Sequence, residues 1–188
     1  MKQEKLEQLK KQCIEASSET IVFGEGSIDA QIVLVGEAPG AKEVEQGKPF
    51  VGQAGKNLDE FLKVLELERD AIYITNVVKI RPYKVNEKTG RKSNRPPSKE
   101  EVEYYKNYLL EEIQVIQPKV VVTLGNVPLK TVLKNAKAAI GEKHGIPVQL
   151  ENYYVFPLYH PASIIYRQEL KKVYREDLEK LKEFLKGI

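Results

Sequence analysis

Four side chains with useful chemistry lie in short segments between the apolar runs of the sequence. Glu37 is in GEAPG, Phe50 in GKPFVG, Asn76 in YITNVVK and His160 in YHPAS. A carboxylate can hold a water molecule or balance a positive charge that forms on a sugar, and an imidazole can donate a hydrogen bond to a developing anion. An amide can read the edge of a nucleobase, and an aromatic ring on a glycine-rich loop can stack on its face.

Each of the four residues also has an ordinary structural interpretation. A glutamate after a strand can cap a helix, and a loop histidine can bond to a carbonyl. Asparagine is a common turn residue, and phenylalanine more often fills the core than it binds a ligand. The combination of carboxylate, aromatic ring, amide and imidazole nevertheless suits hydrolysis of an N-glycosidic bond with a bound nucleobase, provided that all four lie at one place.

The patterns that surround these residues predict that they meet. Apolar runs rich in Val and Ile at 32–35, 71–79, 119–125 and 152–161 alternate with helical patterns at 2–16, 56–67, 98–117, 127–135 and 163–186. Ser98 and Glu101 have the spacing of a capping box. The alternation predicts an α/β fold, a three-layer αβα sandwich with a central, mainly parallel four-stranded sheet, in one domain over residues 1–188. Ligand sites of such sheets lie beyond the carboxyl ends of the strands.

The composition excludes several classes of protein. The chain has 188 residues, of which 41% are hydrophobic and 30% charged, as in globular domains. No apolar run approaches the roughly 18 residues of a membrane span, and the N-terminal segment lacks the apolar stretch of a signal peptide. We therefore expect a cytoplasmic, nucleoid-associated monomer. The single cysteine, Cys13, excludes an intrachain disulfide and leaves no set of thiolates for a metal or cluster.

Positive charge is concentrated between residues 79 and 99, although the whole chain carries only +3. This stretch has a single acid, Glu87. It could neutralise the phosphates of a nucleic acid, or it could be a solvated loop. The candidate DNA contacts in it are Lys79, Arg81, Arg91, Lys92 and Arg95.

Four segments together resemble a known family. GEAPGAKEVEQGKPFVGQAG, YITNVVKIRP, PKVVVTLG and YHPAS are similar, in order and spacing, to the motifs of family 4 uracil-DNA glycosylases, over about residues 31–170. The resemblance implies that the chain flips uracil out of single- or double-stranded DNA and hydrolyses its N-glycosidic bond, leaving an abasic site. No nucleophilic lysine stands in the motifs, which implies a monofunctional enzyme without a lyase step.

The resemblance also implies a role for each matching residue. Glu37 would orient the attacking water and stabilise an oxocarbenium-like sugar, and His160 would stabilise uracil O2 as the base leaves. Phe50 would stack on the flipped base, and Asn76 would read uracil O4 and N3. Glu43 would crowd the C5 position and disfavour thymine.

Two residues of the first motif would act through their backbone. Ala38 and Gly40 stand in the turn after Glu37, and the resemblance implies that they offer amides around the pocket.

The chain departs from the family at its iron–sulfur cluster. The four positions that carry cysteines in the family correspond here to Cys13, Ala16, Ile80 and Tyr105, and only one of these can bind iron. We therefore expect no cluster and no other cofactor, with apolar packing of Ile80 and Tyr105 in its place.

Two further departures concern DNA contacts. The stretch TGRKSNRPP is similar to an Arg-rich loop of a related branch that captures DNA covalently through a histidine, but Asn94 stands near that place here, which predicts turnover instead of capture. After YHPAS, the arginine expected by the resemblance comes one place later, at Arg167. An apolar wedge, Ile164 or Ile165, is expected to enter the duplex, with Ser163 and Arg167 as further contacts.

Two alternatives remain open from the sequence. The first is a glycosylase for another deaminated base, hypoxanthine or xanthine. The second is a protein that binds uracil-containing DNA without cleaving it.

Overall fold

A six-stranded sheet forms the central layer of the computed structural model, which describes residues 1–188. The strand order is β1-β3-β2-β6-β8-β7. Its four inner strands run parallel, and they are β2 (Ile32–Gly36), β3 (Tyr73–Asn76), β6 (Val120–Leu124) and β8 (Tyr154–Leu158). An antiparallel strand flanks them on each side, β1 (Glu25–Gly26) and β7 (Val148–Gln149).

The inner strands correspond to the four predicted from Val- and Ile-rich runs. Almost every residue in them is buried, because helices cover both faces of the sheet. The prediction of four strands is wrong in number, since each edge strand has only two residues and leaves no pattern that a sequence could reveal.

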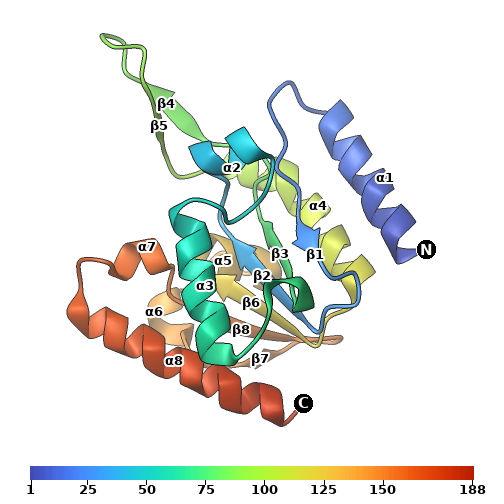
Figure 1. The fold of residues 1–188 in the computed structure, drawn as a ribbon, viewed down its shortest axis with the longest axis vertical. Helices are drawn as coiled ribbons and strands as arrows, with labels where there is room; N and C mark the ends of the chain where they lie inside the picture. Colours follow the sequence, from blue (N-terminus) through green and yellow to red (C-terminus); the bar gives the residue numbers. More distant parts are fainter.

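The helices form the two outer layers, which confirms the predicted three-layer αβα sandwich (Figure 1). On one face lie α1 (Lys2–Glu15), α4 (Lys99–Ile116) and α5 (Asn126–Leu133); on the other lie α3 (Gln53–Leu65) and α8 (Gln168–Lys186). Shorter helices, α2 (Ala41–Gln46), η1 (Arg69–Ala71), α6 (Ile140–Lys143) and α7 (Pro161–Ile164), lie in the connections. None of the helices combines the length and the apolar character that crossing a lipid bilayer requires.

Helix α4 begins at the predicted capping box. The Ser98 hydroxyl accepts a hydrogen bond from the backbone N–H of Glu101 at 3.1 Å, and the Glu101 carboxylate accepts one from the N–H of Ser98 at 2.9 Å. Two amides that the first turn would leave unsatisfied are thereby bonded, so the start of α4 is defined by local sequence.

The basic stretch before α4 is a β-hairpin, whereas the sequence predicted a loop. Strands β4 (Tyr83–Val85) and β5 (Lys92–Asn94) pair antiparallel, and Figure 1 shows them projecting from the body of the molecule. The ammonium group of Lys92 lies 4.4 Å from the centroid of the Tyr83 ring, a cation–π contact across the ladder. The hairpin has no alternation of apolar and polar residues, which is why the sequence did not reveal it.

The register of the parallel strands aligns their carboxyl ends. Gly36 at the end of β2 pairs with Asn76 at the end of β3, and Leu124 of β6 pairs with Leu158 of β8. The segments that follow these strands therefore emerge at one edge of the sheet.

A buried ion pair holds the end of β3. Lys79 and Glu112 are fully buried and bonded to one another. The Lys79 ammonium also donates to the Thr75 hydroxyl at 2.6 Å and to the backbone carbonyl of Asn76 at 2.7 Å. Glu112 accepts further hydrogen bonds from the hydroxyls of Tyr73, at 2.8 Å, and Thr75, at 3.0 Å. Both charges are thus fully satisfied inside the protein.

We expect Lys79→Met to lower the free energy of unfolding by about 3–5 kcal/mol, because it leaves the Glu112 carboxylate buried without its counter-charge. Adding Glu112→Leu should restore much of this loss, since both charges are then removed. Urea denaturation at neutral pH measures both effects, and Lys84→Met, at an exposed position of β4, is the control. A loss of 1 kcal/mol or less in Lys79→Met would show that the pair does not hold the strand end.

Candidate active site

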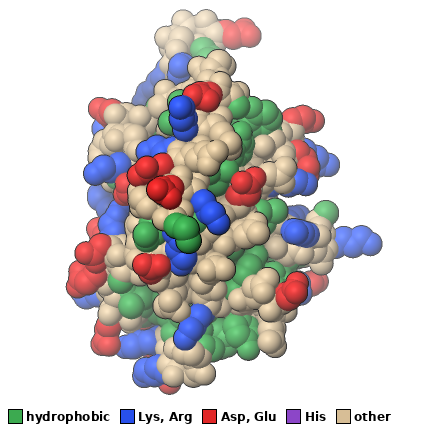
Figure 2. Space-filling view, turned by 90° about the vertical axis from the view of Figure 1, so that its right-hand side faces the viewer, with side chains coloured by type: hydrophobic (Ala, Val, Ile, Leu, Met, Phe, Trp, Pro, Cys, Tyr) green, Lys and Arg blue, Asp and Glu red, His purple; other side chains and the backbone are tan.

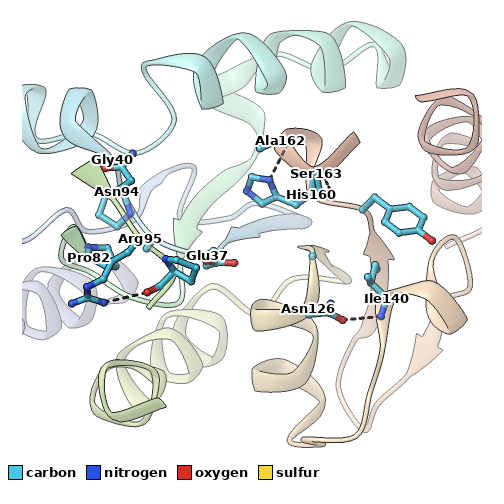
Figure 3. Close-up of a pocket in the computed structure, with 15 residues that line it drawn as sticks. Glu37, Gly40, Pro82, Asn94, Arg95, Asn126, Ile140, His160, Ala162 and Ser163 are labelled. Carbon is cyan, nitrogen blue, oxygen red and sulfur yellow. Dashed lines mark hydrogen bonds between the residues drawn. The ribbon is translucent and has the colours of Figure 1, made fainter. Parts of the chain in front are cut away.

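A cavity of about 580 Å³ opens at the carboxyl ends of the parallel strands. Its walls come from residues 37–40 after β2, 125–126 after β6, 159–160 and 162–163 after β8, and the base of the hairpin at Pro82 and 94–96. Figure 3 shows Glu37 and His160 reaching into this space, between the hairpin base and Asn126. The volume is in the range of sites for small ligands, roughly 300–1,000 Å³.

Glu37 is held by its backbone while its side chain stays unpaired. Its carbonyl accepts a hydrogen bond from the N–H of Val78 at 3.1 Å, which ties the segment after β2 to the segment after β3. Its half-buried carboxylate lines the cavity, and burial raises its pKa. A carboxylate in this state is a stronger base than an exposed one and has lone pairs free for a water molecule.

His160 is fixed in a single orientation by the start of α7. Its Nδ1 accepts a hydrogen bond from the backbone N–H of Ala162 at 3.1 Å, so the proton of the neutral ring is on Nε2. Burial lowers the pKa of His160, which keeps the ring neutral at physiological pH. The Nε2–H group is therefore a preorganised donor for an anion in the cavity.

Gly125 makes room for this histidine. Its φ of 85° lies in the left-handed region, and a Cβ at this position would come within 3.2 Å of the His160 Cβ. A side chain at residue 125 would strain the backbone and displace the imidazole.

Phe50 and Asn76 meet at Gly36. A Cβ on Gly36 would overlap with Asn76 Oδ1 and would lie 2.8 Å from Phe50 Cζ. Both side chains are buried, and neither lines the 580 Å³ cavity. Phe50 instead shares a small hollow of about 20 Å³ with His160. The structure thus brings the four predicted residues to one end of the sheet, with His160 between the two spaces.

The Glu43 carboxylate is occupied by backbone groups. It accepts hydrogen bonds from the N–H groups of Gly40 at 3.0 Å, Val51 at 3.0 Å and Gly52 at 2.8 Å. The Gly40 amide is therefore not free for a ligand, contrary to the prediction. The Ala38 amide forms no hydrogen bond within the protein, so only this one of the two predicted amides is available.

Two polar residues of the cavity wall, Asn94 and Asn126, were not predicted as site residues, although the sequence placed Asn94 near the position of a related branch's histidine. Asn94 ends β5, and its side-chain oxygen accepts a hydrogen bond from Arg81 Nε at 2.7 Å. Asn126 begins α5, and its side-chain oxygen accepts one from the backbone N–H of Ile140 at 2.9 Å. Asn126 follows the Gly125 that stops a predicted strand, a signal that could have marked it. Asn94 reaches the cavity only because the hairpin folds back.

Two of the predicted DNA contacts are wrong because the residues are inside the protein. Lys79 is fully buried in its ion pair with Glu112. Ile164 is buried in the core under α8. Beside it, Ile165 and Tyr166 have exposed fractions of 38% and 95%, so these two side chains form the exposed apolar tip of the turn. The sequence predicted only Ile164 or Ile165 as the apolar wedge, and Tyr166 was not included.

The other predicted DNA contacts lie at the surface. Some of their side chains are bonded within the protein, and others are exposed without such a bond. Ser163 lines the cavity, and Arg167 is exposed. Arg81 is held by Asn94, and Arg95 forms an ion pair with Glu101 at 2.6 Å. The exposed basic side chains of the hairpin are Lys84, Lys88, Arg91 and Lys92. On the face that carries α1, by contrast, acidic and basic side chains are interspersed (Figure 2).

The positions that correspond to the family's cluster ligands do not fit an iron–sulfur cluster. Cys13 and Tyr105 are buried in one apolar cluster, and Ile80 packs against it. Ala16, Ile80 and Tyr105 carry no sulfur that could bind iron, and burial raises the pKa of the Cys13 thiol to about 11. The hydroxyl of Tyr104 donates to the carbonyl of Ala16 at 2.9 Å, which ties the end of α1 to α4.

A carboxylate and a neutral imidazole that face one cavity, beyond the carboxyl ends of a mainly parallel sheet, define an α/β protein with a site for acid–base chemistry. Comparison with known proteins narrows this class. The family model of the uracil DNA glycosylase superfamily matches residues 23–182. A type-4 uracil-DNA glycosylase of Thermotoga maritima is 38% identical over 169 residues, which cover 88% of this chain and 83% of that protein.

Two further relatives are also uracil-DNA glycosylases. A type-4 uracil-DNA glycosylase of Sulfurisphaera tokodaii is 39% identical over 170 residues, covering 86% of this chain and 73% of that protein. A type-5 uracil-DNA glycosylase of Pyrobaculum aerophilum is 33% identical over 155 residues, covering 74% and 64%. The chain belongs to the uracil-DNA glycosylase superfamily, which confirms the resemblance found in its motifs.

Proposed function

We propose that the chain is a monofunctional uracil-DNA glycosylase that flips uracil out of DNA and hydrolyses its N-glycosidic bond, leaving an abasic site. The observation that carries the proposal is that Glu37 and His160 face one cavity while Phe50 and Asn76 meet at Gly36 beside it. The type-4 uracil-DNA glycosylases to which the chain is similar along most of its length support the choice of substrate. We expect it to act as a monomer at the nucleoid.

In this reaction, His160 meets the negative charge of the leaving base. The bond between C1′ and N1 breaks, its electron pair stays with N1, and charge spreads to uracil O2. The Nε2–H of the neutral imidazole donates to that oxygen without having to be protonated first. A single preorganised donor of this kind is worth about 2.7–4 kcal/mol of barrier.

Glu37 acts on the positive charge that develops on the sugar. As the base leaves, the sugar gains oxocarbenium character, which the ionised carboxylate stabilises. The same carboxylate orients a water molecule whose oxygen bonds to C1′, and it accepts the proton that the water loses. No lysine lines the cavity, so the residues present support direct hydrolysis and offer no amine for a Schiff base.

Base recognition falls to the residues around Gly36. The Asn76 amide can both donate and accept, as the O4 and N3 edge of uracil requires. The Phe50 ring supplies a face on which the base stacks. The contact of Glu43 with uracil C5 stays a prediction, and its carboxylate meets three backbone amides in the free protein.

The exposed basic hairpin is suited to the phosphates of single- or double-stranded DNA, because its root lines the cavity and its free charges lie towards its tip. The exposed Ile165 and Tyr166 are suited to enter a duplex beside the flipped nucleotide. We also infer that the chain folds without an iron–sulfur cluster, because three of the four corresponding positions lack a sulfur ligand and the fourth is a buried thiol.

The wild-type protein should cleave a uracil-containing oligonucleotide after alkali treatment, and Glu37→Gln should lower the rate by about 10²-fold or more. Because burial raises the pKa of Glu37, the wild-type rate should fall, as pH is lowered, at a higher pH than an ordinary carboxyl would set, and this limb should be absent from Glu37→Gln. Glu45→Gln, at an exposed residue of α2, is the control.

The outcomes of that assay separate the alternatives. A tenfold or smaller effect of Glu37→Gln would place the catalytic role elsewhere. Binding of uracil-containing DNA without cleavage would leave a non-catalytic binder, and cleavage at hypoxanthine or xanthine but not at uracil would establish the altered base choice.

Neutralising Lys88, Arg91 and Lys92 with glutamine should reduce the slope of log K against log salt by about 2–3, because each phosphate contact releases nearly one counterion. The rate at saturating DNA should stay within about twofold. The matched control carries three changes of the same kind on α1, at the exposed Lys5, Lys10 and Lys11. Equal slopes for the hairpin variant and the wild type would remove the hairpin from the DNA interface.

The purified protein should be colourless, and Cys13→Ala should lower the free energy of unfolding by only about 1 kcal/mol. Tyr105→Ala should lower the free energy of unfolding by about 3–5 kcal/mol, because it leaves a cavity in the core where the buried ring packs, at a position that is a cluster ligand in the family. Absorbance spectra, iron content and urea denaturation test this. A broad band near 400 nm that disappears in Cys13→Ala would overturn the inference.

A further inference from the structure

The loop between α2 and α3 holds Phe50 in an unfavourable backbone conformation. Phe50 has a φ of 54°, in the left-handed region, where a clash between the Cβ and the backbone disfavours a residue other than glycine. Such a conformation persists only where the surroundings enforce it, and it often accompanies a functional site.

Arg69 binds the two carbonyls at this point of the loop. Its Nη1 donates to the carbonyl of Phe50 at 2.9 Å, and its Nη2 donates to the carbonyl of Pro49 at 2.8 Å. Arg69 belongs to η1, which follows α3, and its guanidinium also contacts Glu25 of β1 at 3.5 Å. The fixed fork of the guanidinium suits two successive carbonyls, and a lysine ammonium does not reproduce that geometry.

Glu43 binds the loop from the amide side. One oxygen of its carboxylate accepts hydrogen bonds from the N–H groups of both Val51 and Gly52, directly after Phe50. A cation therefore holds the carbonyls of residues 49 and 50, and an anion holds the amides of residues 51 and 52. Together they oppose relaxation of Phe50 to an ordinary φ.

We propose that Arg69 is a positioning residue for base binding, because it holds Phe50 in the conformation that places its ring against Gly36. This proposal rests on the proposed function and adds to it a residue outside the cavity and outside the motifs of the active site. Arg69 does not touch the base and acts only through the backbone of Phe50 and Pro49.

The fit at Gly36 makes the position of the ring critical. Because a single added carbon on Gly36 would lie 2.8 Å from Phe50 Cζ, there is little free space between the ring and the strand end. A ring released by loss of Arg69 can move towards Asn76 or away from the stacking position. Stacking on an aromatic ring is worth roughly 1–3 kcal/mol per base, which is about 5- to 150-fold in binding.

The test compares Arg69→Met with Arg69→Lys and with the control Arg175→Met, an exposed arginine of α8 that contacts Glu60. Arg69→Met should lower kcat/KM on uracil-containing DNA by about tenfold, mainly through KM, because stacking binds the ground state and the transition state alike. Arg69→Lys should fall between Arg69→Met and the wild type, and Arg175→Met should match the wild type.

A double-mutant cycle separates positioning from general destabilisation. If Arg69 acts through Phe50, then Arg69→Met should change kcat/KM less than twofold in a Phe50→Ala background. The same tenfold loss in both backgrounds, or a loss in kcat alone, would overturn the proposal.

Amide hydrogen exchange at Val51 and Gly52 gives a readout that needs no activity. Exchange at these two amides should be faster in Arg69→Met than in the wild type, while exchange in the central strands stays unchanged. Unchanged exchange at both amides would overturn the role of Arg69 in holding the loop. A wild-type protein that excises no uracil, with faster exchange in Arg69→Met, would overturn the proposed function and leave the restraint on Phe50 standing.

Discussion

The buried pair of Lys79 and Glu112 links the core of the protein to its candidate active site. The Lys79 ammonium binds the carbonyl of Asn76, at the last residue of β3, while Glu112, near the C-terminal end of α4, anchors that ammonium. The end of β3 is thereby fixed against the end of β2, where Gly36 pairs with Asn76. The amide of Asn76, the ring of Phe50 and the carboxylate of Glu37 are all placed relative to this junction. A helix on one face of the sheet thus determines geometry at its edge.

Burial acts in opposite directions on the two groups that face the cavity. It raises the pKa of Glu37 and lowers the pKa of His160, because it disfavours the charged form of each. The two side chains do not form an ion pair, so neither compensates for the other. The imidazole stays neutral with its donor atom fixed by Ala162, and the carboxylate remains the basic group of the site. Because of this difference, His160 is suited to stabilise an anion and Glu37 is suited to activate a water molecule.

The sequence predicted the parts of the structure that local patterns encode. The four inner strands are continuous apolar runs, the start of α4 is a capping box, and the polar residues after the strands share one edge because parallel strands must end there. Contacts between distant segments left no such pattern. Nothing in the sequence indicates that Lys79 pairs with Glu112 in the core. Likewise, nothing indicates that the Glu43 carboxylate binds the backbone amides that follow Phe50. The hairpin was missed because its strands bury nothing.

The hairpin links the wall of the cavity to an exposed basic tip. Its root, at Asn94 and Arg95, is part of the cavity wall, and its ladder from Tyr83 to Asn94 joins that wall to the exposed tip. A nucleotide in the cavity and a phosphate at the tip would therefore be held at a set interval along the same strand. On the proposed function, the spacing between the cavity and the hairpin tip would act as a molecular ruler if the tip contacts a phosphate of the bound strand. Uracil too near the end of a broken strand would then leave the tip without a phosphate, and this would set a minimum length for the substrate.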